Sequence, residues 1–213
     1  IRACGEDART LLQGQLTNDI QQVTPEHSQL SGLCSPKGRM LANFRIIERA
    51  DALYLLLPAE QLPMVLQRLR MFVLRAQVAL SDASAELVRL GLLGDGIADV
   101  LPAEAPQSAD GVLTVDELTL VRVAGTLPRY LVLAPAAAAQ ALWHKARAAG
   151  AEATHHDTWP LLDIRSGVPV IGEANREAFV PQMANMQLID GVSFTKGCYT
   201  GQEVVARMQY LGK

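Results

Sequence analysis

Lys196-Gly197-Cys198-Tyr199-Thr200-Gly201-Gln202-Glu203 is the most site-like stretch of the chain, and we call these eight residues the octet. The spacing of Thr200 and Glu203 predicts a capping box, with Thr200 as the N-cap of a helix. Cys198 would then lie two residues before that helix, where the helix dipole and nearby Lys196 favour a thiolate. Glycines on both sides allow close approach of a partner. The octet therefore indicates a functional thiol, with a buried, inert cysteine as the simpler interpretation.

The composition is that of an ordinary globular protein. The 213 residues are 49% hydrophobic and 19% charged, and the formal net charge is −3. This balance argues against a general nucleic-acid binder, so we expect no direct nucleic-acid binding. The three cysteines are odd in number and widely spaced, which predicts neither a disulfide framework nor a cysteine-based zinc site. Reduced thiols, and the lack of an apolar run long enough to cross a bilayer, predict a cytoplasmic protein without membrane contact.

Hydrophobic spacing predicts helices and strands in mixed order. Helices are expected over 7–20 and 59–74, and strands over 40–48 and 52–57. From residue 86 onward a βαββαβ order can be followed. Its strands are expected over 86–93, 112–115, 118–123 (extended by 130–133) and 151–155, and its helices over 95–101 and 135–149. A last helix is expected over 157–166. The mixture predicts the α+β class.

His155, His156 and Asp157 are the one cluster of metal-ligating residue types that the spacing suggests. Adjacent residues on the predicted strand would point to opposite faces of the sheet. The two imidazoles could then not easily bind one ion, so the sequence predicts no metal site.

The octet resembles the signature of the YgfZ-type folate-binding proteins, and further segments resemble the same family in the same order. These are Leu12-Gln13-Gly14-Gln15-Leu16-Thr17-Asn18-Asp19-Ile20, Ser35-Pro36-Lys37-Gly38-Arg39-Met40-Leu41, Gly167-Val168-Pro169-Val170-Ile171-Gly172 and Phe179-Val180-Pro181-Gln182-Met183. The resemblance therefore covers nearly the whole chain.

That family is similar in fold to the T-protein of the glycine cleavage system, a tetrahydrofolate-dependent aminomethyltransferase. The resemblance implies ferredoxin-like α+β domains around a central folate channel. It implies a discontinuous first domain, 1–48 plus 157–213, that carries the octet, and an inserted ferredoxin-like domain, 49–156. The family's C-terminal β-barrel would follow this chain and is expected to be largely absent from it.

Two departures from T-protein bear on activity. T-protein has a catalytic aspartate, whereas the similar stretch here, Gly38 to Asn43, has no carboxylate. Asn43 can form hydrogen bonds but cannot act as a general base. T-protein also holds the pterin with a glutamate, and the corresponding region near Gly125 to Leu133 has none. Classical aminomethyl transfer is therefore not expected, although the resemblance leaves the question of enzymatic activity open.

The resemblance implies a tetrahydrofolate-binding accessory protein that supports the assembly or maintenance of iron–sulfur enzymes, including tRNA-modifying ones. Its partners would be a folate and iron–sulfur enzymes or assembly proteins. Cys198 would be the functional thiol, in redox or cluster chemistry, but one cysteine cannot supply the four ligands of a stable cluster. The residues expected at the folate are Lys196, Gly197, Cys198, Arg207, Asn43, Lys37 and Arg39.

Two alternatives remain open from the sequence. The first is a folate-dependent one-carbon transferase that is aminomethyltransferase-like but uses another general base, in which Asn43 would matter for turnover. The second is an interaction module, in which the octet is a docking surface for a protein partner.

Overall fold

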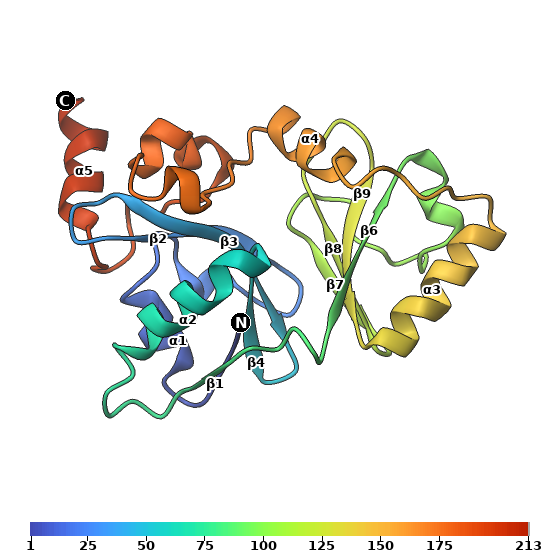
Figure 1. Ribbon diagram of the computed structural model, residues 1–213, viewed down its shortest axis with the longest axis horizontal. Coiled ribbons are helices and arrows are strands. Elements are labelled where there is room, and N and C mark those ends of the chain that lie inside the picture. The colour runs from blue at the N-terminus through green and yellow to red at the C-terminus, as the bar shows by residue number, and fades with distance from the viewer. Residues whose placement is uncertain (213) are drawn as a thin grey trace. The chain divides into compact units, whose positions relative to one another are not determined.

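A computed structural model describes residues 1–212 and divides the chain into two compact units (Figure 1). The first unit comprises Ile1–Thr24, Gln29–Asp82 and the part from Val168 onward, and the second comprises Pro25–Ser28 and Ala83–Gly167. Each unit contains an antiparallel sheet with helices, so the predicted α+β class is confirmed. The sequence-based domain boundaries stay a prediction. The two units differ from them by placing residues 49–82 in the first unit and 157–167 in the second.

The first unit is built on a five-stranded antiparallel sheet with the strand order β2-β3-β4-β1-β5. Its strands are β1 (Arg2–Cys4), β2 (Gln29–Cys34), β3 (Met40–Arg49), β4 (Ala52–Leu56) and β5 (Ala79–Ser81). Its α-helices are α1 (Ala8–Gln13), α2 (Leu62–Arg70) and α5 (Gln202–Leu211). Short 3-10 helices lie at Ile20–Gln22, Ala59–Gln61, Glu173–Asn175, Pro181–Ala184 and Met186–Ile189.

Strand β3 is an interior strand of this sheet, and its polar as well as its apolar side chains are covered. Its first eight residues are all buried. Leucines of α1, α2 and the sheet form one hydrophobic cluster, including Leu12, Leu55 and Leu69. A second cluster joins β2 and β3 to the C-terminal segment through Cys34, Met40 and Val205. The C-terminal segment that carries the octet is thus part of the core of the first unit.

The helix predicted over 7–20 is too long. The structure ends α1 at Gln13, and Leu16 forms an isolated bridge with Leu33 of β2. The amide of Thr17 donates to the carbonyl oxygen of Gly32 at 2.9 Å. Backbone pairing with β2 therefore takes the place of helix after Gly14, while Leu16 stays buried without being helical.

The second unit has the strand order β6-β9-β8-β7, with all pairs antiparallel. Its elements are β6 (Val88–Leu93), a 3-10 helix at Asp95–Asp99, β7 (Val112–Val115), β8 (Leu118–Arg122), β9 (Arg129–Ala134), α3 (Ala136–Ala148) and α4 (Thr158–Arg165). Leu142 and Ala146 of α3 pack with Leu120 and Val132 of the sheet.

Residues 151–155 form no strand, so the prediction that they close this sheet is wrong. Strand β6 lies at the edge of the sheet and pairs with β9 on its inner side, from Val88–Ala134 to Leu93–Arg129. The segment 151–155 is exposed and leads directly to α4.

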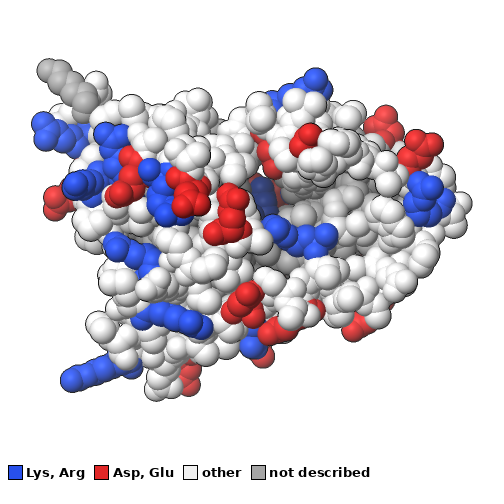
Figure 2. All heavy atoms as spheres, in the orientation of Figure 1, with Lys and Arg blue, Asp and Glu red and all other residues white. Residues whose placement is uncertain are grey.

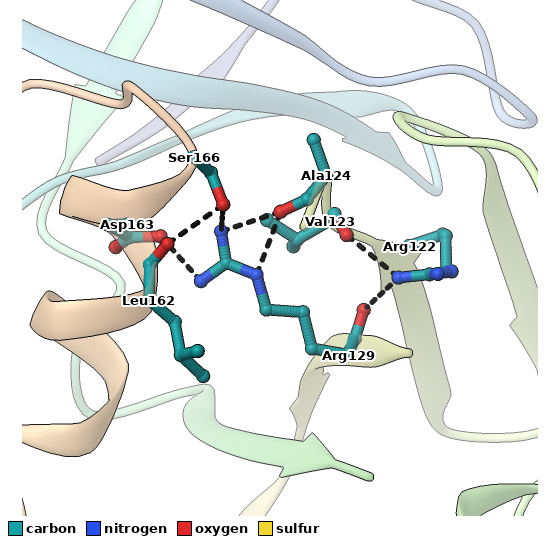
Figure 3. A network of polar contacts seen from close by, with 7 residues as sticks. All are labelled: Arg122, Val123, Ala124, Arg129, Leu162, Asp163 and Ser166. Carbon is teal, nitrogen blue, oxygen red and sulfur yellow. Dashed lines mark hydrogen bonds and ion pairs between the residues drawn. The ribbon is translucent and has the colours of Figure 1, made fainter. Parts of the chain in front are cut away.

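Helix α4 is fixed to its own unit by one buried arginine (Figure 3). The Arg129 side chain is 1% exposed and donates to a carboxylate oxygen of Asp163 at 2.7 Å. The same guanidinium donates twice to the carbonyl oxygen of Ala124 and once to the hydroxyl of Ser166. A buried charge is tolerated when it is paired and hydrogen-bonded in this way. Arg129 therefore joins the start of β9 to α4.

Charged side chains are interspersed on the face shown in Figure 2, where lysine and arginine alternate with aspartate and glutamate on a largely uncharged surface. Within residues 1–212, none of the helices combines the length and apolar character that a membrane crossing needs.

Candidate functional site

Lys196 anchors the octet to the segment after α1. Its side chain is buried, and its ammonium donates to the carbonyl oxygens of Gln13 and Leu16 at 2.6 Å and of Asn18 at 3.1 Å. Burial lowers the pKa of Lys196 to about 8, and the negative charge of Asp19 acts in the opposite direction. The ammonium thus points into the protein. It holds the loop in place, while the residues that follow it reach the surface.

The Thr17–Asn18 pair forms a second link between the same two segments. The Thr17 hydroxyl donates to the carbonyl oxygen of Gly191 at 2.7 Å and accepts from the amide of Gly32 at the same distance. The Asn18 side-chain amide donates to the carbonyl oxygens of Asp190 and Leu30 at 2.6 and 2.9 Å. These bonds connect β2 with the residues just before the octet, so the octet lies on a well-braced base.

Helix α5 does not begin with the predicted capping box. It begins at Gln202, and its N-cap is Gly201, with a left-handed φ of 84° and no side-chain capping bond. The hydroxyl of Thr200 instead donates to the side-chain oxygen of Gln15 at 3.2 Å, and Glu203 is exposed. The prediction of Thr200 as N-cap is therefore wrong. The N-cap is Gly201, whose positive φ angle is one that glycine adopts more readily than other residues.

Gly201 and Gly38 lie against each other, which joins the start of α5 to the β2–β3 turn. A Cβ on Gly201 would lie 2.9 Å from the Cα of Gly38 and inside the contact distance of the Ser35 carbonyl oxygen. A Cβ on Gly38 would lie 2.7 Å from the Cβ of Val204. Since both glycines also have positive φ angles, no other residue type fits without a shift of the backbone.

The three cysteines have different environments. Cys198 is exposed, Cys4 is partly buried and Cys34 is fully buried. Burial raises the pKa of Cys34 to about 12. Burial also raises the pKa of the neighbouring Tyr199, with a further contribution from Cys34. The thiol that is open to reagents is therefore Cys198, beside Gly197, where an added Cβ would meet no atom within 4 Å.

Asn43 has a structural role in β3. Its side-chain amide donates to the carbonyl oxygen of Pro169 at 2.7 Å, and its side-chain oxygen accepts from the amide of Ile171 at 2.8 Å. Asn43 is 8% exposed. Both ends of the side chain thus bind the backbone segment that follows the second unit in sequence.

The remaining basic candidates differ in how they are held. Lys37 is exposed at the β2–β3 turn, and Arg207 is exposed on α5. Arg39 is partly buried and donates to the carbonyl oxygen of Ala178 at 2.6 Å. The contact between Gly38 and Gly201 brings the Lys37 turn beside the octet. The structure thus brings the Lys37 turn and the octet together, whereas Asn43 and Arg39 are held by the backbone of other segments.

The five segments singled out in the sequence all lie in the first unit, except for Gly167. The segment 179–183 joins the others through the amide of Met40, which donates to the carbonyl oxygen of Phe179 at 2.8 Å, and through Gln182, which donates to the carbonyl oxygen of Val205 at 2.7 Å. The fifth, 167–172, is bound by Asn43. We missed Thr17, Asn18 and Gly201 as organising residues. The polar Thr-Asn pair directly after Leu16, in a segment that resembles the family, is the signal that could have identified the first two.

The fold is similar to that of an aminomethyltransferase. A crystal structure of glycine cleavage system aminomethyltransferase T from Bartonella henselae is similar with a TM-score of 0.55, at 17% sequence identity, over 68% of this chain and 41% of that one. At this level of identity the similarity concerns the fold alone.

Sequence relatives identify the family more narrowly. The chain is 36% identical to the tRNA-modifying protein YgfZ of Colwellia psychrerythraea and 34% identical to that of Edwardsiella ictaluri, over 100% of this chain and 65% of each relative. The YgfZ of Serratia proteamaculans is 35% identical over 98% of this chain and 63% of its own length. The chain is thus similar to YgfZ proteins over its whole length, and the predicted resemblance is confirmed. It spans slightly less than two thirds of these relatives. No family model matches the chain.

Proposed function

We propose that this chain is part of a YgfZ-type protein that acts in tRNA modification and binds a reduced folate, tetrahydrofolate or a close relative, at the octet. The observation that carries the proposal is the way the octet is held. Lys196 and Tyr199 are buried and braced, whereas Gly197 and Cys198 between them are exposed. A rigid base with an open glycine and thiol is suited to contact a bound ligand.

The charge around the octet suits the anionic tail of a folate. Helix α5 begins within the octet, at Gln202, without a side-chain capping bond, and the helix dipole favours negative charge there. Lys37 and Arg207 add exposed positive charge on the adjoining turn and on α5. We propose that these two side chains bind the tail carboxylates, while Gly197 and Cys198 lie against the ligand.

Calorimetric titration with tetrahydrofolate under anaerobic conditions tests this proposal. We expect one saturable site in the wild type and weaker binding in Cys198→Ala. Cys4→Ala is the matched control, since it removes a partly buried thiol in β1, and it should bind as the wild type does. If neither the wild type nor the variants bind any folate, the proposal is wrong.

We further propose that the protein supports iron–sulfur enzymes, including those that modify tRNA, as an accessory factor. The exposed Cys198 supports this role, because an accessible thiol can take part in redox or transient cluster chemistry. The test is the survival of an iron–sulfur tRNA-modifying enzyme during incubation in air. Added wild-type chain should extend its active lifetime more than Cys198→Ala does, and equal lifetimes would contradict the role.

A docking function is a second candidate, favoured by apolar side chains exposed on α5 and on the 3-10 helix Pro181–Ala184 that contacts it. Met183 is 59% exposed, and Tyr210 and Leu211 of α5 are 70% and 65% exposed. If Cys198→Ala keeps its folate affinity but no longer retains a protein partner, the result favours a docking function over folate chemistry at the thiol.

The transferase alternative is tested by the turnover of methyl- or formyl-folates and by the loss of this turnover in Asn43→Ala. Because both ends of the Asn43 side chain bind backbone, we do not propose transferase chemistry there.

A further inference from the structure

Two histidine rings lie side by side in the loop that leads to α4. The ring centroids of His155 and His156 are 4.2 Å apart and the rings are tilted by 40°. The sequence argument against a metal site assumed that residues 151–155 form a strand, with neighbouring side chains on opposite faces. Since the loop forms no strand, that argument does not apply, and the two imidazole rings lie next to each other.

The carboxylate of Asp157 faces both rings. One of its oxygens lies 3.3 Å from Nδ1 of His155, and the other lies 3.2 Å from Nε2 of His156. The potential ligand atoms of all three residues lie within 4.8 Å of one another. In a tetrahedral zinc site with bonds of about 2.0–2.1 Å, ligand atoms are roughly 3.4 Å apart. Each nitrogen–oxygen distance is thus close to a ligand–ligand distance in such a site, although the two histidines face different oxygens of the carboxylate.

The loop is attached to a fixed framework. Helix α4 begins directly after Asp157, and Arg129 holds that helix through Asp163. The Arg129 guanidinium also lies 5.1 Å from the ring centre of Trp159. Trp159 in turn covers Gly91 of β6, where an added Cβ would lie 2.7 Å from the indole ring. The side chains next to the histidines are therefore positioned before any ligand binds.

Both histidines line a groove of about 350 Å³ within the second unit, together with Arg89, Gly91, Thr154 and Trp159 among others. Three protein ligands leave a coordination position open in a tetrahedral metal site. Because His155 and His156 border the groove, the open position would face it. The guanidinium of Arg89 adds a cationic group to the same groove.

We propose that His155, His156 and Asp157 form a site for one divalent transition metal of the zinc class, with an open coordination position toward the groove. Imidazole and carboxylate are the ligand types that suit such a metal. The proposal is independent of folate binding at the octet, because all of its residues lie in the second unit.

Substitution with Co²⁺ gives the sharpest test, since cobalt in place of zinc reports its ligands by its absorption spectrum. We expect the chain to bind one Co²⁺ with the bands of a nitrogen–oxygen site, displaceable by one equivalent of Zn²⁺. The double variant His155→Ala/His156→Ala and the single variant Asp157→Asn should lose this signal. His144→Ala is the matched control, because His144 is exposed on α3, and it should keep the signal.

Two results would overturn the proposal. The first is a cobalt signal that the double variant retains, and the second is a thiolate charge-transfer band that Cys198→Ser abolishes, which would place the metal on the cysteine. Azide added to the cobalt-loaded chain tests the open position and should change the bands. An unchanged spectrum at saturating azide would refute that part. Circular dichroism checks that the variants, which alter exposed side chains, remain folded.

Discussion

Replacing Gly201 with alanine tests whether close packing between α5 and the β2–β3 turn holds the octet in place. The residue has a φ of 84°, and an added Cβ would lie 2.9 Å from the Cα of Gly38. A left-handed conformation costs an alanine about 1–2 kcal/mol. Forcing backbone apart adds roughly 1–3 kcal/mol, as in overpacked cores. The lower entropy of the unfolded alanine chain offsets about 0.5–1 kcal/mol of this cost. We therefore expect the free energy of unfolding to fall by about 3 kcal/mol.

Alkylation of Cys34 measures this loss in the first unit. Cys34 is fully buried and shares a hydrophobic cluster with Val205 of α5. It should therefore react only when that cluster opens. In a background with Cys4→Ser and Cys198→Ser, its labelling rate follows the population of the open form. A loss of about 3 kcal/mol corresponds to roughly 100-fold faster labelling, at 1.36 kcal/mol per tenfold change.

The matched control is Gly197→Ala in the same octet, because a Cβ there meets no atom within 4 Å. It should label at close to the parent rate. Trp143 and Trp159 are both in the second unit, so their fluorescence should stay unchanged in both variants. If Gly201→Ala and Gly197→Ala label Cys34 at the same rate, the packing argument is refuted.

Three further predictions follow from buried charges and thiols. Lys196 has a pKa of about 8 in the folded chain, below the ordinary value of 10.5. Between these two pH values the unfolded chain binds more protons than the folded chain. The free energy of unfolding should therefore rise with pH in the wild type, relative to Lys196→Met. Urea titrations of both proteins at pH 7.5, 9 and 10 measure the difference, and parallel pH profiles would contradict it. Arg129→Met leaves the Asp163 carboxylate without its buried partner and should destabilise the second unit by roughly 3 kcal/mol, followed by tryptophan fluorescence. Asp163→Asn keeps a polar side chain at that position and should cost less; an Arg129→Met protein as stable as the wild type would count against the anchor. At pH 8, a charged thiol reagent should modify Cys198 rapidly and leave Cys34 unmodified until denaturant is added, whereas rapid modification of Cys34 in the native state would disprove its burial.

The sequence predicted the elements that depend on local periodicity. The strands β3 and β4, the β7–β8 hairpin and α3 lie close to the expected residues. The sequence-based prediction failed where long-range pairing decides the backbone conformation. The helix over 7–20 stops early because Thr17 pairs with β2. The segment 151–155 stays exposed and does not add to the edge strand β6.

Contacts between residues far apart in sequence also limited the prediction of the candidate site. The octet could be singled out from its residue types, but its capping box could not be judged, because the contact of Gly201 with Gly38 lies between residues far apart in sequence. Lys196 was expected to supply charge to a ligand. Instead, its ammonium is directed to carbonyl oxygens near α1, a relation that no local pattern contains.

Protection of Cys198 from alkylation by tetrahydrofolate tests most directly whether the octet is a folate site. The measurement uses the chain with Cys4→Ser, under anaerobic conditions with ascorbate as the reductant. Because Cys34 is buried, the labelling rate reports Cys198. We predict that the rate falls with tetrahydrofolate concentration to a plateau, and that Lys37→Glu or Arg207→Glu shifts this fall to higher concentrations. A labelling rate that stays constant over the whole concentration range would contradict folate binding at the octet.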